Sequence, residues 1–250
     1  MVGAAGHTPL SVIVQLPGNA GRLYYYRVMT AAAPPTSPSP EALYPSRAAA
    51  GAMLGRLLYQ RTTPPVVLLG VTPTGVEIAA NAAQALNCPF DVIIGAHVRV
   101  DGLGLVGAIA EDSDAVTDPE FSPTFDALDH LNEAMDRARR AVKTERLLFR
   151  GQRPLRSVEG TNVVIVEGQL TSPWKVLAAA RAIQQAGAER VYLAAAVATN
   201  QAKERIRAHR FDLVCPTVLL DDAGHPRPFG DPQDPSAERL RSIVVARQAA

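Results

Sequence analysis

The chain has 250 residues, of which 47% are hydrophobic and 20% are charged, and its 25 basic residues nearly balance its 24 acidic ones. This composition is ordinary for a globular protein with one substantial core, and a net charge of +1 excludes a general electrostatic attraction to nucleic acids or anionic membranes. Cys88 and Cys215 lie in no metal-type spacing, no apolar run is long enough to cross a membrane, and the N-terminus lacks a leader pattern. We therefore expect a cytoplasmic protein with two buried thiols.

Residues 1–30 are predicted to form a β-hairpin extension. The β-rich runs SVIVQL (residues 11–16) and RLYYYRVM (residues 22–29) flank a Pro- and Gly-containing turn. We interpret the hairpin as an added edge or a dimer arm, with a ligand-binding role as the alternative, and we expect a homodimer. Residues 31–45 contain five prolines and are predicted to be an extended linker. Deleting residues 1–30 should therefore leave a folded domain.

From residue 46 to residue 220, apolar runs alternate with helical stripes. This alternation predicts an α/β fold: a three-layer, mostly parallel twisted sheet with helices on both faces. The predicted strands are residues 66–69, 91–95, 161–166, 191–197 and 212–215, and the predicted helices are residues 46–61, 75–86, 122–150, 172–187 and 200–209. An Asp-Gly turn between residues 97–100 and 103–110 predicts a hairpin flap. Residues 221–250 are predicted to be an acidic, proline-rich loop followed by a terminal helix or strand.

The fold is organised around residues 161–187. A buried valine-rich strand leads into an acidic turn over residues 167–171, and Ser172 and Pro173 then provide an N-cap and a first-turn proline for a helix that ends at Gly187. In open α/β sheets, ligands bind where strands end and helices begin. This junction is therefore the predicted ligand site.

The same stretch resembles the PRPP (5-phosphoribosyl 1-diphosphate) binding motif of type I phosphoribosyltransferases. Tyr44-Pro45-Ser46-Arg47 is similar to the F-x-D-R start of the opening helix in a bacterial family of this kind. Residues 107–112 (GAIAED) resemble its G-A-V-A-E-D turn, and residues 149–154 (FRGQRP) resemble its Y-R-G-G-R-P segment. The resemblance implies that fold, a PRPP or other phosphate-bearing or nucleotide ligand, and Mg²⁺ only when PRPP is bound.

The departures from this family pattern fall on its functional loops. The paired acids become Glu167 and Gly168, the phosphate-binding A-T-G-A-T becomes TSPWK (residues 171–175), the pyrophosphate loop becomes VTPTG (residues 71–75), and an Arg-Lys pair becomes Ala-His (residues 96–97). Glu167 is the candidate catalytic residue because a carboxylate can hold ribose hydroxyls. The candidate ligand-binding residues are Thr74, Gly75, His97, Glu167, Thr171, Ser172 and Lys175; none is assigned to a metal.

Local chemistry predicts how these residues are used. Lys175 lies in a first helical turn, where a cation is unfavourable unless an anion is near, and we favour a pairing with Glu167 over a ligand phosphate. Ser172 is expected to cap its own helix, and Thr74 and Glu77 are expected to form a capping box. Such caps would compete with a phosphate for the same N–H groups. His97 is interpreted as a polar rim residue rather than as a base.

A basic stripe follows the longest predicted helix: Arg139, Lys143, Arg146 and Arg150. We favour a solvated face over a phosphate-binding one, because the net charge is near zero. Three functions remain open. The favoured one is a catalytically degenerate phosphoribosyltransferase-like protein that acts as a binding or regulatory scaffold. The alternatives are an active divergent phosphoribosyltransferase, recognised by turnover of PRPP, and a nucleic-acid-binding protein that uses the stripe, recognised by salt-dependent binding.

Overall fold

The computed structural model describes residues 42–122, 124, 127–220, 227–231 and 233–248, together with the backbone of residues 12–14 and 24–26. The two short N-terminal segments form β1 (Val12–Val14) and β2 (Tyr24–Tyr26), which pair antiparallel with each other. The rest of the predicted hairpin and most of the predicted linker lie outside the described residues. The hairpin over residues 1–30 and the domain boundaries therefore stay predictions.

The core of the protein is a parallel sheet in the order β11–β9–β8–β3–β4. Its strands are β3 (Val66–Val71), β4 (Phe90–Ile93), β8 (Asn162–Leu170), β9 (Arg190–Thr199) and β11 (Thr217–Leu219), and the short β10 (Leu213–Val214) also pairs with β9. The predicted parallel pairing of the two valine-rich strands is confirmed, with Val67 opposite Val163 and Leu69 opposite Ile165. β11 was not among the predicted strands, which ended at residue 215.

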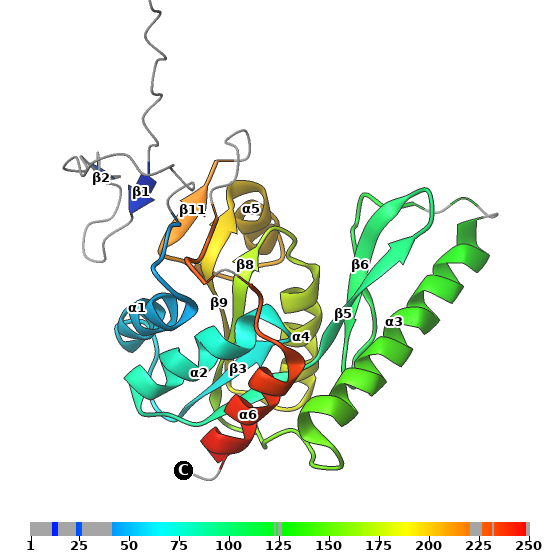
Figure 1. The fold of residues 1–250 in the computed structure, drawn as a ribbon. Helices are drawn as coiled ribbons and strands as arrows, with labels where there is room; N and C mark the ends of the chain where they lie inside the picture. The colour runs from blue at the N-terminus through cyan, green and yellow to red at the C-terminus, as the bar shows by residue number, and fades with distance from the viewer. Residues whose placement is uncertain are drawn as a thin grey trace, which may run out of the picture.

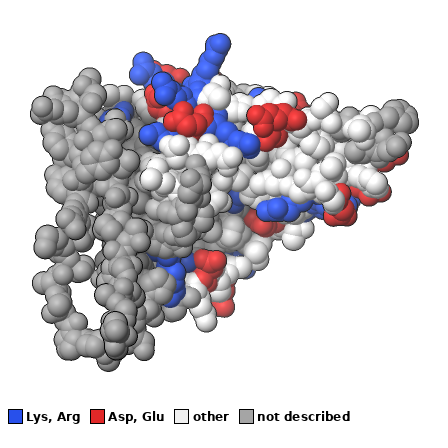
Figure 2. All heavy atoms as spheres, turned by 90° about the horizontal axis from the view of Figure 1, so that it is seen from above, with Lys and Arg blue, Asp and Glu red and all other residues white. Residues whose placement is uncertain are grey.

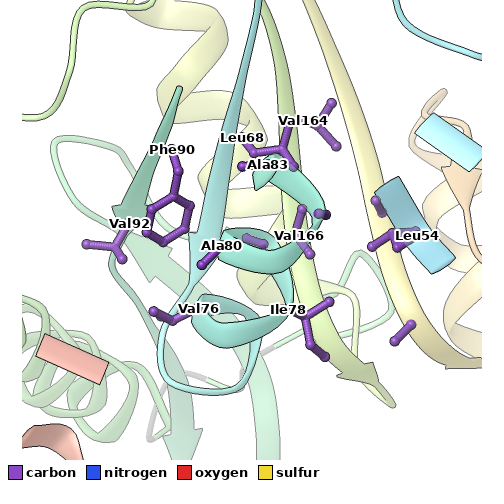
Figure 3. Packing of buried hydrophobic residues seen from close by; sticks show 14 of the residues in the cluster. Leu54, Leu68, Val76, Ile78, Ala80, Ala83, Phe90, Val92, Val164 and Val166 are labelled. Atoms are coloured by element: carbon purple, nitrogen blue, oxygen red, sulfur yellow. The ribbon is translucent and has the colours of Figure 1, made fainter. Parts of the chain in front are cut away.

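Helices cover both faces of this sheet, as Figure 1 shows. One face is covered by α1 (Arg47–Tyr59), α2 (Thr74–Leu86) and α6 (Ala237–Gln248). The other face is covered by α4 (Trp174–Gln185) and α5 (Asn200–Ala208). Successive strand residues point to opposite faces, so Leu68 and Val164 pack under α2 while Val67 and Ile165 pack under α4. Figure 3 shows the first of these layers. The terminal element, left open between helix and strand, is a helix.

A flap projects beside this body (Figure 1). It consists of the antiparallel strands β5 (Gly95–Val100), β6 (Gly104–Ala110) and β7 (Val116–Thr117), backed by the long helix α3 (Ala127–Arg150). Val98, Val106 and Ala138 belong to its own small apolar core. The predicted flap is confirmed and has a third strand, whereas the predicted helix start at residues 122–123 is wrong, since α3 begins at Ala127.

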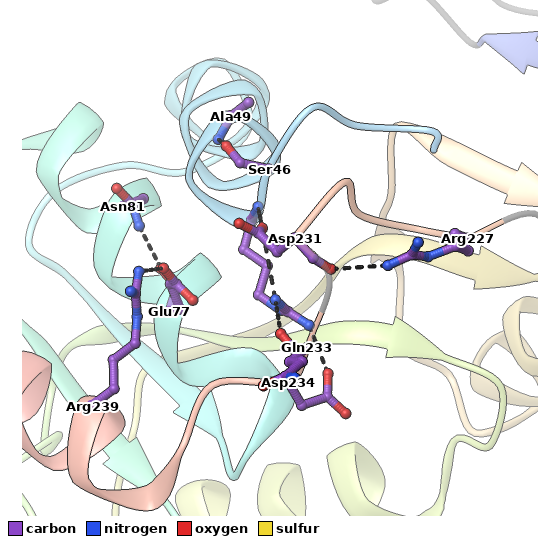
Figure 4. A network of polar contacts seen from close by, with 10 residues as sticks. Ser46, Ala49, Glu77, Asn81, Arg227, Asp231, Gln233, Asp234 and Arg239 are labelled. Carbon is purple, nitrogen blue, oxygen red and sulfur yellow. Dashed lines mark hydrogen bonds and ion pairs between the residues drawn. The ribbon is translucent and has the colours of Figure 1, made fainter. Parts of the chain in front are cut away.

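The two ends of the described body are joined at the start of α1, as Figure 4 shows. The Arg47 guanidinium is 2.6 Å from the Asp234 carboxylate and donates to the Gln233 carbonyl at 2.9 Å, and the Arg47 backbone N–H donates to Asp231 at 2.6 Å. The same guanidinium lies 5.2 Å from the ring centroid of Phe229. The described residues of segment 227–234 thus close over the N-terminus of the first helix.

Candidate functional site

Two loops meet at the carboxyl ends of β3 and β8, where the sequence placed the ligand site. The loops are in direct backbone contact. A Cβ added to Gly75 would lie 2.0 Å from the carbonyl oxygen of Val166, and one added to Gly168 would lie 2.7 Å from the carbonyl oxygen of Thr74. Both positions therefore require glycine, and the two loops leave no room for a side chain between them.

Glu167 is the centre of this junction. It is only 3% exposed, and its carboxylate accepts hydrogen bonds from the Thr74 hydroxyl and, at 3.0 Å, from the Gly168 N–H. The ammonium group of Lys175 lies 3.3 Å from the second carboxylate oxygen. The predicted pairing of Lys175 with Glu167 is confirmed. A buried charge is tolerated only when it is paired and hydrogen-bonded, and Glu167 is both.

The Lys175 ammonium has a second partner that leads to α3. It donates to the Thr72 carbonyl at 3.1 Å, and the Thr72 hydroxyl donates to the Glu145 carboxylate at 2.7 Å. Thr72 and Glu145 were not among the predicted site residues. They are 73 positions apart, so no local pattern in the sequence links them.

The predicted side-chain caps are wrong at both helices. The residues before α2 and α4 are Pro73 and Pro173, and neither start has a side-chain cap hydrogen bond. Thr74 is already inside its helix, and its hydroxyl donates to the stronger, charged acceptor, Glu167. The oxygen of Ser172 is buried with no hydrogen-bond partner in the part of the chain that the structure describes.

Glu77, the other half of the predicted capping box, has a different role. Its carboxylate lies 2.7 Å from the Arg239 guanidinium and fastens α6 to α2, as Figure 4 shows. Glu77 points away from the helix start because a partner 162 positions later competes for it.

The predicted acidic turn over residues 167–171 is also wrong. β8 continues through it, with Gln169 opposite Val197 and Leu170 opposite Ala198 of β9. Only residues 171–173 then connect β8 to α4. Next in the chain, Trp174 is buried, with its ring centroid 5.9 Å from that of His209. The indole is thus part of the core and does not face a ligand.

His97 is half-buried on β5, beside the same junction. Burial, together with the positive charges of Lys175 and Arg99, lowers the pKa of its imidazole to about 4. Its Nδ1 is buried and has no hydrogen-bond partner among the described residues. The imidazole is therefore neutral at pH 7. Thr171, by contrast, is exposed at the end of β8.

The predicted basic stripe does not form one continuous face. Arg150 is buried, pairs with the Glu111 carboxylate and donates to the Val92 carbonyl at 3.4 Å. The Arg150 side chain supports the flap. The prediction of a solvated stripe of four residues is therefore wrong for Arg150, the last of them. On the face shown in Figure 2, Lys and Arg side chains lie among Asp and Glu side chains, and this mixture does not favour a nucleic-acid surface.

A model of the phosphoribosyl transferase domain matches residues 46–233. The chain belongs to this family. The expected α/β fold, a parallel sheet with helices on both faces, is confirmed.

Two curated relatives of Mycobacterium tuberculosis, each named "Putative phosphoribosyl transferase", are 27% identical over 185 residues. That alignment covers 69% of this chain but 40% of each relative, so the chain spans about two fifths of their length. Among solved structures, the protein TT1426 from Thermus thermophilus matches with a TM-score of 0.69 and 25% identity, over 81% of this chain and 98% of that one. These similarities agree with the family assignment.

Two further properties bear on the ligand. Among the described residues, no group of three or more His, Cys, Asp and Glu side chains is arranged to hold a metal ion. None of the described helices is long and apolar enough to span a membrane.

The Mg²⁺ that the resemblance implied with PRPP does not fit the observed donors, because Glu167 is already paired and residue 168 offers no carboxylate.

Proposed function

We propose that this chain is a phosphoribosyl transferase-family protein whose PRPP site is closed, and that it acts as a binding or regulatory scaffold rather than as a transferase. The observation that carries the proposal is the state of Glu167. Its carboxylate, the only one left of the family's acidic pair, is buried and held by Thr74, Gly168 and Lys175. Both hydrogen bonds occupy Oε1, the Lys175 ammonium lies 3.3 Å from Oε2, and the residue is only 3% exposed, so a ribose hydroxyl would have to reach a buried and already paired carboxylate.

The loss of the second acid is built into the backbone. A side chain at position 168 would start 2.7 Å from the Thr74 carbonyl oxygen, which is closer than real Cβ contacts come. An aspartate cannot be restored there without separating the two loops. The backbone contact at Gly168, and not only the residue present there, thus keeps a second carboxylate out of this site.

The anion-binding part of the site is reduced in the same way. A helix start binds phosphate through its free N–H groups, which a glycine-rich loop leaves accessible. Here the connection is the short segment 171–173, Pro173 has no N–H, and Trp174 is buried in the core. Neither helix start has a side-chain cap, so the N–H groups that remain are not occupied in the way the sequence suggested.

Binding of PRPP to the full chain tests this proposal. Calorimetry with PRPP and Mg²⁺ should show no saturable heat at about 1 mM ligand. The melting temperature should not rise either. A ligand that did bind would raise it measurably, since at 100 times its dissociation constant it would add about 2.7 kcal/mol of stability.

A matched pair of variants makes the result specific. Lys175→Met removes a candidate ligand cation at the junction, and Lys203→Met removes a cation from α5, away from these loops. Micromolar binding of PRPP that Lys175→Met abolishes and Lys203→Met leaves intact would establish a live site. Release of pyrophosphate in the presence of a nucleobase panel would establish the alternative, an active divergent transferase.

A further inference from the structure

A concave site lies between α3 and the turn that follows β6. It is a cavity of ≈ 540 Å³. Arg139, Lys143 and Arg146 of α3 line one wall, residues 111–114 line the other, and Ile109, Ala110, Val142 and Gln185 complete the lining. Cavities of about 300–1,000 Å³ are typical of small-molecule sites. The volume is much larger than a single inorganic phosphate needs.

This cavity is separate from the loop junction, although α3 serves both. Positions 139, 143 and 146 lie on one face of the helix, at intervals of four and three residues. Glu145 lies on the adjacent face and bonds to Thr72 at the junction. The cavity site therefore does not depend on whether the junction is open or closed, and this inference goes beyond the proposed function.

The α3 wall is basic, and its charges are largely unpaired. Among the described residues, neither Lys143 nor Arg146 has a carboxylate within 4.0 Å, and Arg139 has only the exposed Asp136, at 3.0 Å. The helix dipole explains a cation near a C-terminus, but Arg139 and Lys143 lie more than one turn from either end of α3. These cations are therefore available to an anionic ligand.

The opposite wall is acidic. Asp112 and Asp114 line the cavity, and within the described part of the chain neither has a cation within 4.0 Å. Asp112 has φ = 53°, a left-handed conformation that Asp and Asn tolerate better than most residues. The neighbouring Glu111 is different, because its carboxylate is already paired with Arg150. Asp112 and Asp114 are exposed, as are Arg139 and Lys143, so the cavity brings two acids and three cations to one opening with no ion pair between the two groups.

The floor between the charged walls is apolar. Ile109, Ala110 and Val142 line the cavity and are buried. An apolar floor with polar groups at opposite ends is the usual form of a site that orients an elongated small molecule. The floor offers a surface for a flat ring between the two charged ends.

We propose that this cavity binds a nucleoside phosphate, with the phosphate on Arg139, Lys143 and Arg146 and the N–H donors of the base on Asp112 and Asp114. Charge-assisted hydrogen bonds at both ends fix the orientation of such a ligand, and the apolar floor receives the base or the sugar. A sugar phosphate without a base would leave Asp112 and Asp114 without a partner. A nucleoside without phosphate would leave Arg139, Lys143 and Arg146 without one.

Calorimetry on the full chain with AMP, CMP and GMP tests the proposal, with ribose 5-phosphate and adenosine as half-ligands. At least one nucleotide should bind with a dissociation constant of about 1 mM or lower, and it should bind about tenfold or more tightly than either half-ligand. No binding by any of the three nucleotides, or equal binding of ribose 5-phosphate, would overturn the proposal.

Variants locate the binding. The double variant Lys143→Gln/Arg146→Gln should weaken nucleotide binding about tenfold or more, and Arg140→Gln, an exposed neighbour outside the cavity lining, should leave it unchanged. Asp114→Asn should weaken nucleotide binding and leave ribose 5-phosphate unaffected. If the Lys143/Arg146 variant binds normally and Lys175→Met does not, the nucleotide occupies the loop junction. That result would overturn the cavity site and the closed-site proposal together, whereas PRPP binding lost only in the Lys143/Arg146 variant would leave the junction closed.

Discussion

Replacing Glu167 with glutamine should destabilise the protein if the junction of the two loops is a structural element. The substitution keeps the size of the side chain and removes its charge. The remaining carbonyl oxygen can still accept from Thr74 and Gly168, but the amide group then faces the Lys175 ammonium, donor against donor. We therefore expect a lower free energy of unfolding, because Glu167 joins the two loops through Thr74, Gly168 and Lys175.

The burial of the pair sets the magnitude. Removing one partner of a fully buried ion pair costs about 3–5 kcal/mol. Here the Lys175 side chain is 14% exposed and keeps its bond to the Thr72 carbonyl, so part of its charge can be solvated. We therefore expect a loss of about 2 kcal/mol in the free energy of unfolding, which lowers the melting temperature by about 4–8 °C in a chain of this size.

Urea unfolding, followed by circular dichroism and by the fluorescence of the single, buried Trp174, measures this loss. A double-mutant cycle with Lys175→Met should give a coupling energy of about 1–2 kcal/mol. Glu189→Gln, on an exposed residue, should stay within about 0.5 kcal/mol of the parent. The reasoning is refuted if Glu167→Gln is as stable as that control, because Glu167 would then be free to serve a ligand.

Three further outcomes are expected. Gly168→Ala should cost about 1–3 kcal/mol of stability in urea unfolding, because the new methyl group meets the Thr74 carbonyl. His97→Gln should flatten the pH dependence of stability: the folded state holds the imidazole pKa at about 4, below its unfolded value of about 6.5, so the parent loses stability as the pH falls from about 6.5 toward 4. Arg47→Gln should increase hydrogen exchange over residues 227–234 and cost about 1–2 kcal/mol, less than a fully buried pair because its acidic partners are partly exposed.

Each of these changes has a control in the same chain. Gly95→Ala should be nearly neutral, since its new methyl group would come no closer than 3.7 Å to any neighbour. His130→Gln and Arg56→Gln alter exposed residues of α3 and α1. A control that behaves like its test variant, or a His97→Gln protein that keeps the parent's loss of stability between pH 7 and pH 5, would contradict the corresponding argument.

The sequence predicts the sheet well because burial on both faces leaves a strong local signal. The valine-rich runs that became β3 and β8 need no partner information to be recognised as buried parallel strands. The pairing of Lys175 with Glu167 could also be predicted, since a cation in a first helical turn needs an anion nearby. In both cases the decisive residues are neighbours in the chain.

The errors have the opposite character. Thr74 has the right spacing for a capping box, but a carboxylate 93 positions away is a stronger acceptor for its hydroxyl. Arg150 has the right spacing for a solvated stripe, but it is buried because it forms an ion pair with the buried Glu111. Local patterns cannot reveal such competitors, because tertiary contacts decide which of two satisfactory partners a polar group takes.

The closure of segment 227–234 over Arg47 has a consequence for biosynthesis. The start of α1 is among the first parts of the body to leave the ribosome, yet the acidic and aromatic partners of Arg47 are nearly the last. Until residues 231 and 234 have emerged, the guanidinium that the finished fold buries has no carboxylate from that segment. Although domains can fold as units during synthesis, the start of α1 in this one gains its ion pairs only after residues 231 and 234 are made. A nascent chain stalled before residue 227 would carry α1 with its cation unpaired.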